Sequence, residues 1–255
     1  MSGEVGGAAR VPRQFERVDW RPGPRYTPGE WPFTLPVVEQ LIGEGGFEIP
    51  SGVTILVGEN GSGKSTLVEA LAQVYPRAGV QNPFVNLLGR GESAEDSPLA
   101  TCLRARTHRL ASPAGFFLRA EAMHDYFAAI DTDPAQRRAW AGQLLNRQSH
   151  GESFLAVLRH RFTDLGVYFL DEPEAALSFQ SCLGLVALLD AMRVQGSQAI
   201  VATHSPLLAS LPGATLLELG EWGLRPASYD DLELVRNWRS YLDDPQRWLR
   251  HVLAP

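Results

Sequence analysis

The chain contains few cysteines and no long apolar run. Cys102 and Cys182 belong to no CxxC motif or Cys/His cluster, which argues against a metal site or a disulfide framework. No stretch approaches the roughly 18–20 apolar residues that a membrane-spanning helix requires, and the first residues lack the apolar segment of a signal peptide. We therefore expect a cytoplasmic protein with no membrane insertion.

Lysine is even rarer than cysteine. Neither positive nor negative charge dominates the sequence. Lys64 is the only lysine among 23 Lys and Arg residues, and a genomic coding bias toward arginine is the simplest explanation. Lys64 is then the one position that offers a compact ammonium in place of a planar guanidinium. The formal net charge of -6 argues against a protein coated with basic surface for nucleic acid. A local basic patch remains compatible with that total.

The composition is that of an ordinary folded protein. The 255 residues are 44% hydrophobic and 20% charged, and their mean hydropathy is -0.12. These values exclude wholesale disorder and a disulfide-stapled miniprotein. The length allows one large α/β domain or two small ones.

Strands alternate with helices over most of the chain. Residues 53–57 (VTILV) form a β-branched run typical of a strand buried on both faces, and the apolar period of residues 65–75 predicts a helix that Pro76 ends. The other expected strands are residues 115–121, 166–170, 198–203 and 214–219, and the other expected helices are residues 152–162, 178–194, 229–241 and 245–253. The alternation predicts an α/β fold with a mostly parallel sheet flanked by helices.

Composition also divides the chain into an arm and a domain. Residues 1–30 are rich in Gly, Pro and Arg without periodicity, which predicts a flexible arm. Residues 31–255 are expected to form the domain, starting with edge strands in residues 31–48. The irregular residues 77–150 predict a small helical lobe inserted in that domain, with helices near residues 121–130 and 134–147.

A glycine-rich turn follows the first buried strand. Residues 58–65 (GENGSGKS) fit GxxxxGK[ST] between a strand and a helix, where this motif binds nucleotide phosphates; a plain glycine-rich turn is the alternative. Backbone N–H groups and the helix N-terminus converge on the phosphates, Lys64 reaches the β- and γ-phosphates, and Ser65 ligates Mg²⁺. The residues assigned to this nucleotide site are Gly58, Glu59, Asn60, Gly61, Ser62, Gly63, Lys64, Ser65 and Thr66.

Two carboxylates end another expected strand. Asp171 and Glu172 follow the apolar residues 166–170, which places them at the carboxyl edge of the sheet, where open α/β folds bind ligands. Asp171 can hold Mg²⁺ through a water, and Glu172 can orient or deprotonate the water that attacks the γ-phosphate. Alternatively, DEP only ends a strand and opens a turn.

Two weaker patterns lie near helix and strand ends. His204 follows the expected strand 198–203 and could sense the γ-phosphate, although a lone histidine is more often structural. Residues 149–153 (SHGES) precede an amphipathic helix and could bind a second phosphate group across a dimer interface. The same residues also fit an ordinary capping box.

Taken in order, these segments resemble a known family. GENGSGKST, SHGES, YFLDEPEAAL and ATHS are similar to the Walker A, signature, Walker B with D-loop, and switch-histidine motifs of the ATP-binding-cassette (ABC) ATPases. DEPEAAL and ATHSP resemble the corresponding motifs of the soluble branch that includes RecF-like, SMC-like and double-strand-break-repair ATPases. FFLRAE and QSHGESF are closest to small stand-alone bacterial predicted ATPases.

The resemblance implies a P-loop NTPase fold and a head-to-tail homodimer that encloses two ATP molecules. One subunit would bind ATP through the Walker A residues, and Ser149, Gly151 and Glu152 of the other would clamp the γ-phosphate. Glu172 would be the catalytic base, His204 the switch histidine, and residues 176–178 the D-loop.

The sequence departs from the family pattern at three places. His150 stands where the signature usually has glycine, Gln148 stands where it has leucine, and Ser178 stands where many D-loops have aspartate. Glu121 is the candidate for the Q-loop position.

The sequence does not identify the binding partner of the protein. Residues 100–165 contain nine arginines against six acidic residues, with a cluster at Arg104, Arg106, His108 and Arg109. This excess allows a contact with a DNA backbone, but a solvated or internally paired face is the commoner reason for it. The leading hypothesis is an Mg²⁺-dependent ATPase acting as a switch. The alternatives are a transporter's nucleotide-binding subunit and a DNA- or protein-binding regulator with slow hydrolysis.

Overall fold

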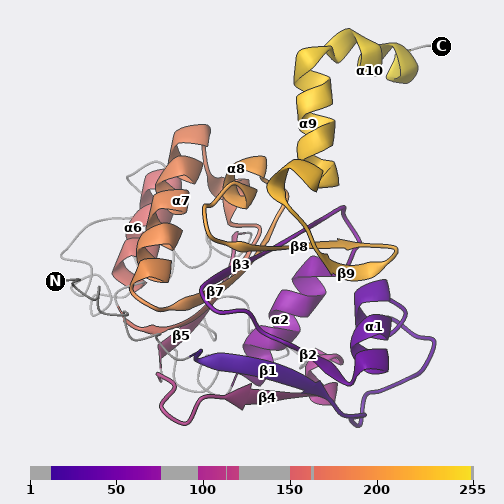
Figure 1. The fold of residues 1–255 in the computed structure, drawn as a ribbon, viewed down its shortest axis with the longest axis vertical. Helices are drawn as coiled ribbons and strands as arrows, with labels where there is room; N and C mark the ends of the chain where they lie inside the picture. The colour runs from indigo at the N-terminus through magenta and orange to yellow at the C-terminus, as the bar shows by residue number, and fades with distance from the viewer. Residues whose placement is uncertain (1–12, 76–96, 113, 121–149, 162–163, 254–255) are drawn as a thin grey trace, which may run out of the picture.

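A six-stranded sheet forms the centre of the computed structural model, which describes residues 13–75, 97–112, 114–120, 150–161 and 164–253. The strand order is β5-β6-β7-β3-β8-β9 (Figure 1). The strands are β3 (Val53–Gly58), β5 (Ala114–Arg119), β6 (Gly166–Asp171), β7 (Gln198–Thr203), β8 (Thr215–Gly220) and β9 (Gly223–Pro226). All neighbouring pairs are parallel except the β8–β9 hairpin. The expected α/β fold with a mostly parallel sheet is confirmed.

Helices cover both faces of this sheet. On one face lie α1 (Pro36–Glu44) and α2 (Lys64–Val74), and on the other lie α6 (His150–Arg161), α7 (Phe179–Val194) and the short α8 (Pro206–Ala209) (Figure 1). Strand residues alternate between the two cores, since Ile55 packs in the cluster with α6 and α7 while Leu56 packs in the cluster with α2. Burial on both faces explains why the central strands are continuously apolar.

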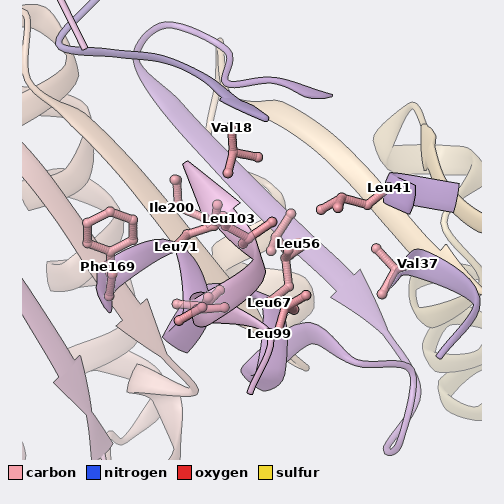
Figure 2. Close-up of a cluster of buried hydrophobic side chains, with 14 of the residues drawn as sticks. Val18, Val37, Leu41, Leu56, Leu67, Leu71, Leu99, Leu103, Phe169 and Ile200 are labelled. Atoms are coloured by element: carbon pink, nitrogen blue, oxygen red, sulfur yellow. The ribbon is translucent and has the colours of Figure 1, made fainter. Parts of the chain in front are cut away.

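A second, antiparallel sheet packs in the same core as α2. It consists of β1 (Phe15–Trp20) between β2 (Gly46–Glu48) and β4 (Leu103–Thr107). Val18 from β1 and Leu103 from β4 share that core with Leu67 of α2 (Figure 2). The prediction of a flexible arm over residues 1–30 is therefore wrong for β1, because Phe15 and Val18 of this strand are buried.

Two further local predictions need correction. Residues 31–48 contain helix α1 where edge strands were expected, and only the short β2 is a strand. Pro36 starts this helix and Gly45, at φ 70°, ends it, a pairing of proline and glycine that is typical of helix ends. Strand β4 was not predicted because it carries the charged residues Arg104 and Arg106.

The remaining elements follow the predicted order, except that the short α8 and β9 were not predicted. The C-terminal helices are α9 (Glu233–Asp243) and α10 (Pro245–Val252), and they extend away from the sheet (Figure 1). Three 3₁₀ turns complete the described elements: η1 (Ala100–Cys102), η4 (Pro173–Ala176) and η5 (Tyr229–Asp231). Within the described ranges, every helix is too short or too polar to cross a membrane. The helices expected near residues 121–130 and 134–147 lie outside the described residues, so the inserted lobe stays a prediction.

Candidate functional site

Three adjacent strands end at the same edge of the sheet. β6, β7 and β3 are neighbours and run parallel, with Asp171 paired to Ala202 and Val57 paired to Thr203. The turn after β3, the acidic residues at the end of β6 and His204 after β7 are therefore brought to one side of the sheet. This is the edge at which open α/β sheets bind ligands.

The turn after β3 is shaped by two glycines. A Cβ added at Gly58 would lie 2.5 Å from the Leu219 carbonyl oxygen, so no side chain fits at this position. Gly63 precedes α2 with φ 95°, which is in the left-handed region that glycine adopts at little cost. These two positions let the turn bend tightly and present the N-terminus of α2.

Lys64 lies inside this turn. Its Nζ donates hydrogen bonds to the carbonyl oxygens of Gly58 at 2.8 Å and Glu59 at 3.0 Å, and the residue is only 3% exposed. Burial lowers the pKa of Lys64, while the charges of Glu172 and Asp171 act in the opposite direction. Lys64 and Glu172 also line one cavity, described below.

Asp171 is buried and paired with an arginine. Arg119, at the end of β5, donates from Nε to Asp171 Oδ2 at 2.9 Å, and its terminal nitrogen contacts Glu69 Oε2 at 3.0 Å. The other oxygen, Asp171 Oδ1, is buried and has no hydrogen-bond partner among the described residues. A buried acceptor of this kind is expected to be satisfied by a bound ion or water.

Glu172 and His204 lie side by side. Glu172 Oε1 is 3.3 Å from His204 Nε2, and the two side chains are partly exposed. Glu172 has φ 48°, the one positive value for a non-glycine residue in the described part of the chain. Backbone strain of this sort concentrates at functional sites, where it orients a side chain.

Glu174 holds the backbone that carries His204. Its Oε1 accepts hydrogen bonds from Thr203 Oγ1 and from the backbone N–H of His204, both at 2.6 Å. The Glu172 backbone N–H also donates to the Ala202 carbonyl at 2.9 Å. The two strand ends are therefore coupled through hydrogen bonds.

Two small cavities open at this edge. One, of about 210 Å³, is lined by Ser65, Arg119, Ala120, Asp171 and Glu172. The other, of about 130 Å³, lies between Trp31 and the phosphate turn and is lined by Trp31, Leu35, Asn60, Gly61, Gly63, Lys64, Ser65, Thr66 and Glu172. Ser65 and Glu172 line both cavities, Lys64 lines the smaller one and Asp171 the larger one.

A larger cavity, of about 530 Å³, lies against Gly58–Ser62 on the side of the β8–β9 hairpin. Its lining includes four glutamates, Glu59, Glu218, Glu221 and Glu233, of which Glu218 is paired with Arg225 at 2.7 Å. Negative charge of this density disfavours a polyphosphate. The two smaller cavities beside Lys64 therefore fit phosphates better.

Comparison with known proteins agrees with this geometry. The hemin import ATP-binding protein HmuV of Burkholderia cenocepacia (strain HI2424) is 31% identical over 209 residues, which cover 68% of this chain and 76% of that protein. The chain belongs to the ABC-type P-loop ATPases. As an ABC-type ATPase it binds and hydrolyses ATP.

Other similarities of this ABC-type ATPase extend over most of the chain. The cytochrome c biogenesis ATP-binding export protein CcmA of Ruegeria pomeroyi is 29% identical over 212 residues, covering 78% of this chain and 97% of that protein. A family described as AAA domain matches residues 42–74. A solved SMC head bound to the C-winged helix domain of ScpA covers 84% of the chain at 14% identity, with a TM-score of 0.46.

Part of the predicted site of this ABC-type ATPase lies elsewhere or outside the described residues. Ser149 and the Q-loop candidate Glu121 are outside them. Gly151 and Glu152 are in the first turn of α6, on the face of the sheet opposite α2 (Figure 1). Of the D-loop, Ser178 caps α7 by accepting a hydrogen bond from the Ser181 N–H at 3.2 Å.

Three residues of the site were not predicted. Arg119 is a charged residue at the end of a buried strand, which is the same pattern that indicated Asp171. Glu174 lies within the DEPEAAL motif itself. Trp31 had no sequence signal, because only folding brings it to the phosphate turn. In the arginine cluster, Arg106 forms an ion pair with Asp19, as an internally paired face would.

Proposed function

We propose that this ABC-type ATPase hydrolyses ATP in an Mg²⁺-dependent reaction at a head-to-tail dimer interface and uses closure and opening of the dimer as a switch. The supporting observation is the convergence of Lys64, Ser65, Asp171 and Glu172 on two adjoining cavities at one sheet edge. Residues 150–153, which belong to the segment predicted to be the signature, start α6 on the other face of the sheet.

Lys64 and the phosphate turn would bind the triphosphate. Backbone N–H groups of the turn and the N-terminus of α2 favour anions, and the Lys64 ammonium would exchange its two carbonyl acceptors for phosphate oxygens. The remaining turn residues assigned to this role are Gly58, Glu59, Asn60, Gly61, Ser62, Gly63 and Thr66.

Ser65 and Asp171 fit a magnesium ion. Both line the 210 Å³ cavity, and Asp171 Oδ1 is a buried acceptor without a partner among the residues described. Hydroxyl and carboxylate oxygens are the protein ligands that Mg²⁺ takes beside phosphates. The ion would neutralise charge that develops on the phosphate oxygens.

Glu172 and His204 would act on the attacking water and the γ-phosphate. Glu172 lines both cavities, and its carboxylate can accept a proton from a water placed there. His204, 3.3 Å from that carboxylate, would contact the γ-phosphate and so distinguish ATP from ADP. Glu174 would keep His204 in position through the backbone.

Trp31 would stack on the adenine. Trp31 is 65% exposed and lines the same cavity as Asn60 and Thr66 of the phosphate turn. A large exposed aromatic ring beside a phosphate site offers a face for a nucleobase.

Replacing this ring gives a test of the base position. Trp31→Ala is expected to weaken ATP binding about 10-fold, because base–aromatic stacking contributes about 1–3 kcal/mol. Binding of inorganic tripolyphosphate, which has no base, should stay unchanged in the same calorimetric titrations. Trp238→Ala, an exposed tryptophan of α9, is the control. Equal losses for ATP and tripolyphosphate would contradict the stacking role.

A second copy of the chain would complete the site. Gly151 and Glu152 lie in the first turn of α6, and α6 packs with α7 on the face opposite α2. Ser149 directly precedes them in the sequence. These residues therefore fit a contact with the nucleotide of a partner better than with that of their own subunit.

The dimer is testable with a variant that retains ATP. Glu172→Gln is expected to sediment at twice the monomer mass with Mg²⁺ and ATP, and as a monomer with ADP, because only ATP carries the γ-phosphate that the partner clamps. Analytical ultracentrifugation measures this directly. Adding Lys64→Ala to Glu172→Gln should abolish the dimer. A monomer under all conditions would exclude the head-to-tail arrangement.

The names of the relatives favour one alternative. HmuV and CcmA are called import and export ATP-binding proteins, so this chain could supply ATP hydrolysis to a membrane permease. Affinity purification of the tagged chain from solubilised membranes separates the two functions. Recovery of a permease in stoichiometric amount supports the transporter subunit, and its absence from a preparation with active ATPase supports the stand-alone switch.

A further inference from the structure

Asp171, the proposed magnesium ligand, has a cationic partner before any metal binds. Its side chain is only 4% exposed, and a buried carboxylate requires a compensating charge. Arg119 supplies that charge from Nε, at 2.9 Å from Oδ2. The Lys64 ammonium instead donates to the carbonyl oxygens of Gly58 and Glu59. Arg119 is thus the direct counter-ion of Asp171.

The guanidinium of Arg119 is held from two sides. β5 pairs with β6 so that Arg119 lies opposite Asp171, and a second nitrogen of the guanidinium contacts Glu69 Oε2 at 3.0 Å. Glu69 is one helical turn after Ser65 on α2. The two contacts fix the positive charge in the wall of the cavity that Ser65 and Asp171 line.

The two oxygens of the Asp171 carboxylate therefore differ in their contacts. Oδ2 is used by Arg119, whereas Oδ1 is buried and has no partner in the described part of the chain. A metal-bound water could donate to Oδ1, but the adjacent guanidinium reduces the attraction of this carboxylate for a bare cation.

The charged side chains around the cavity attract a free divalent cation only weakly. Among the residues that line the cavity, the carboxylates Asp171 and Glu172 are balanced against Arg119, which leaves one net negative charge. Without the Arg119 charge the net value would double. A nucleotide brings several further negative charges to the same place.

We propose that Arg119 is a positioning residue that neutralises Asp171 and keeps the metal site weak for a free divalent cation until ATP adds its own negative charge. This inference rests on the magnesium site of the proposed function. Metal binding then depends on the nucleotide through the ion pair between Arg119 and Asp171.

The test measures Mn²⁺ binding without nucleotide, by electron paramagnetic resonance on the full chain. Arg119→Gln removes the charge and retains an amide donor, and it is expected to bind Mn²⁺ at least ~10-fold more tightly than the wild type. Arg119→Lys retains the charge and should bind Mn²⁺ as weakly as the wild type. Adding Asp171→Asn to Arg119→Gln should remove the gain, because Asp171 supplies the attraction. Arg119→Met, similar in length and uncharged, replaces Arg119→Gln if thermal denaturation shows that the latter does not fold.

The outcomes separate this inference from the proposed function. Unchanged or weaker Mn²⁺ binding by a folded, uncharged variant at position 119 would overturn the counter-ion role. A gain that persists with Asp171→Asn would also overturn it. In a separate measurement, failure of Mn²⁺ to tighten ATP binding by the wild type would contradict the proposed metal site itself.

Discussion

Glu172→Gln is expected to lower the rate of ATP turnover by about 10²–10⁴-fold, the usual contribution of a general base. The change removes the proton acceptor but retains the shape of the side chain and one oxygen beside His204. The phosphate turn and Lys64 are untouched, so ATP binding should change by less than about threefold. Steady-state phosphate release and equilibrium binding of ATP measure the two quantities separately.

The control for this variant is a carboxylate that lies away from the site. Glu39 is exposed on α1, and Glu39→Gln should leave turnover unchanged. Turnover by Glu172→Gln equal to that of the wild type would show that another group activates the water. Loss of turnover together with loss of ATP binding would instead indicate that Glu172 contributes to the shape of the nucleotide site.

Lys64→Ala is expected to weaken ATP binding at least ~100-fold, equivalent to about 2.8 kcal/mol. Hydrogen bonds from a charged donor contribute about 1.5–3 kcal/mol each, and the ammonium is the one lysine charge in the whole chain. The rate of turnover is expected to fall as well, because in the proposed function the ammonium also stabilises the charge that develops on the γ-phosphate. Binding of a fluorescent ATP analogue, followed by anisotropy, gives the affinity.

Two further variants show why the residue must be lysine. Lys64→Arg retains the charge but places a planar guanidinium where the residue is only 3% exposed, so it should fail nearly as completely as Lys64→Ala. Arg247→Ala, at an exposed position of α10, removes a positive charge away from the site and should bind ATP normally. Wild-type affinity in Lys64→Arg would show that charge alone is sufficient.

The two principal variants are expected to affect binding in opposite ways. Glu172→Gln retains ATP and accumulates the bound state, whereas Lys64→Ala prevents that state from forming. Circular dichroism and thermal denaturation of Lys64→Ala separate loss of binding from loss of folding, since removal of the ammonium leaves the Gly58 and Glu59 carbonyls without their donor.

Local sequence patterns predicted the structure correctly wherever the whole pattern lies within one strand, turn or helix. The β-branched run before Gly58, the glycine spacing and the following helical period define a phosphate turn without knowledge of the rest of the chain. The apolar run before Asp171 does the same for the acidic strand end. Buried parallel strands are apolar on both faces, so their ends are easy to recognise.

Patterns failed where a segment has mixed polarity or pairs with a distant one. β1 contains arginine and acidic residues and β4 contains two arginines, and their apolar side chains are buried only because the two strands pair with each other over α2. The short apolar pieces of residues 31–48 fit a strand or a helix equally well by length. Pro36 and Gly45 decide for a helix, and their effect depends on the conformation of the chain around them.

The sequence by itself determined the class of the protein, the mostly parallel sheet, and the identity of Lys64, Ser65, Asp171, Glu172 and His204 as candidates, because each of these residues follows a recognisable local element. Only the tertiary structure decided that Arg119 neutralises Asp171, that Glu174 holds the His204 backbone, and that Trp31 lies beside the phosphate turn. These contacts join residues from separate elements. Their distances depend on strand order and register, which are properties of the folded chain as a whole.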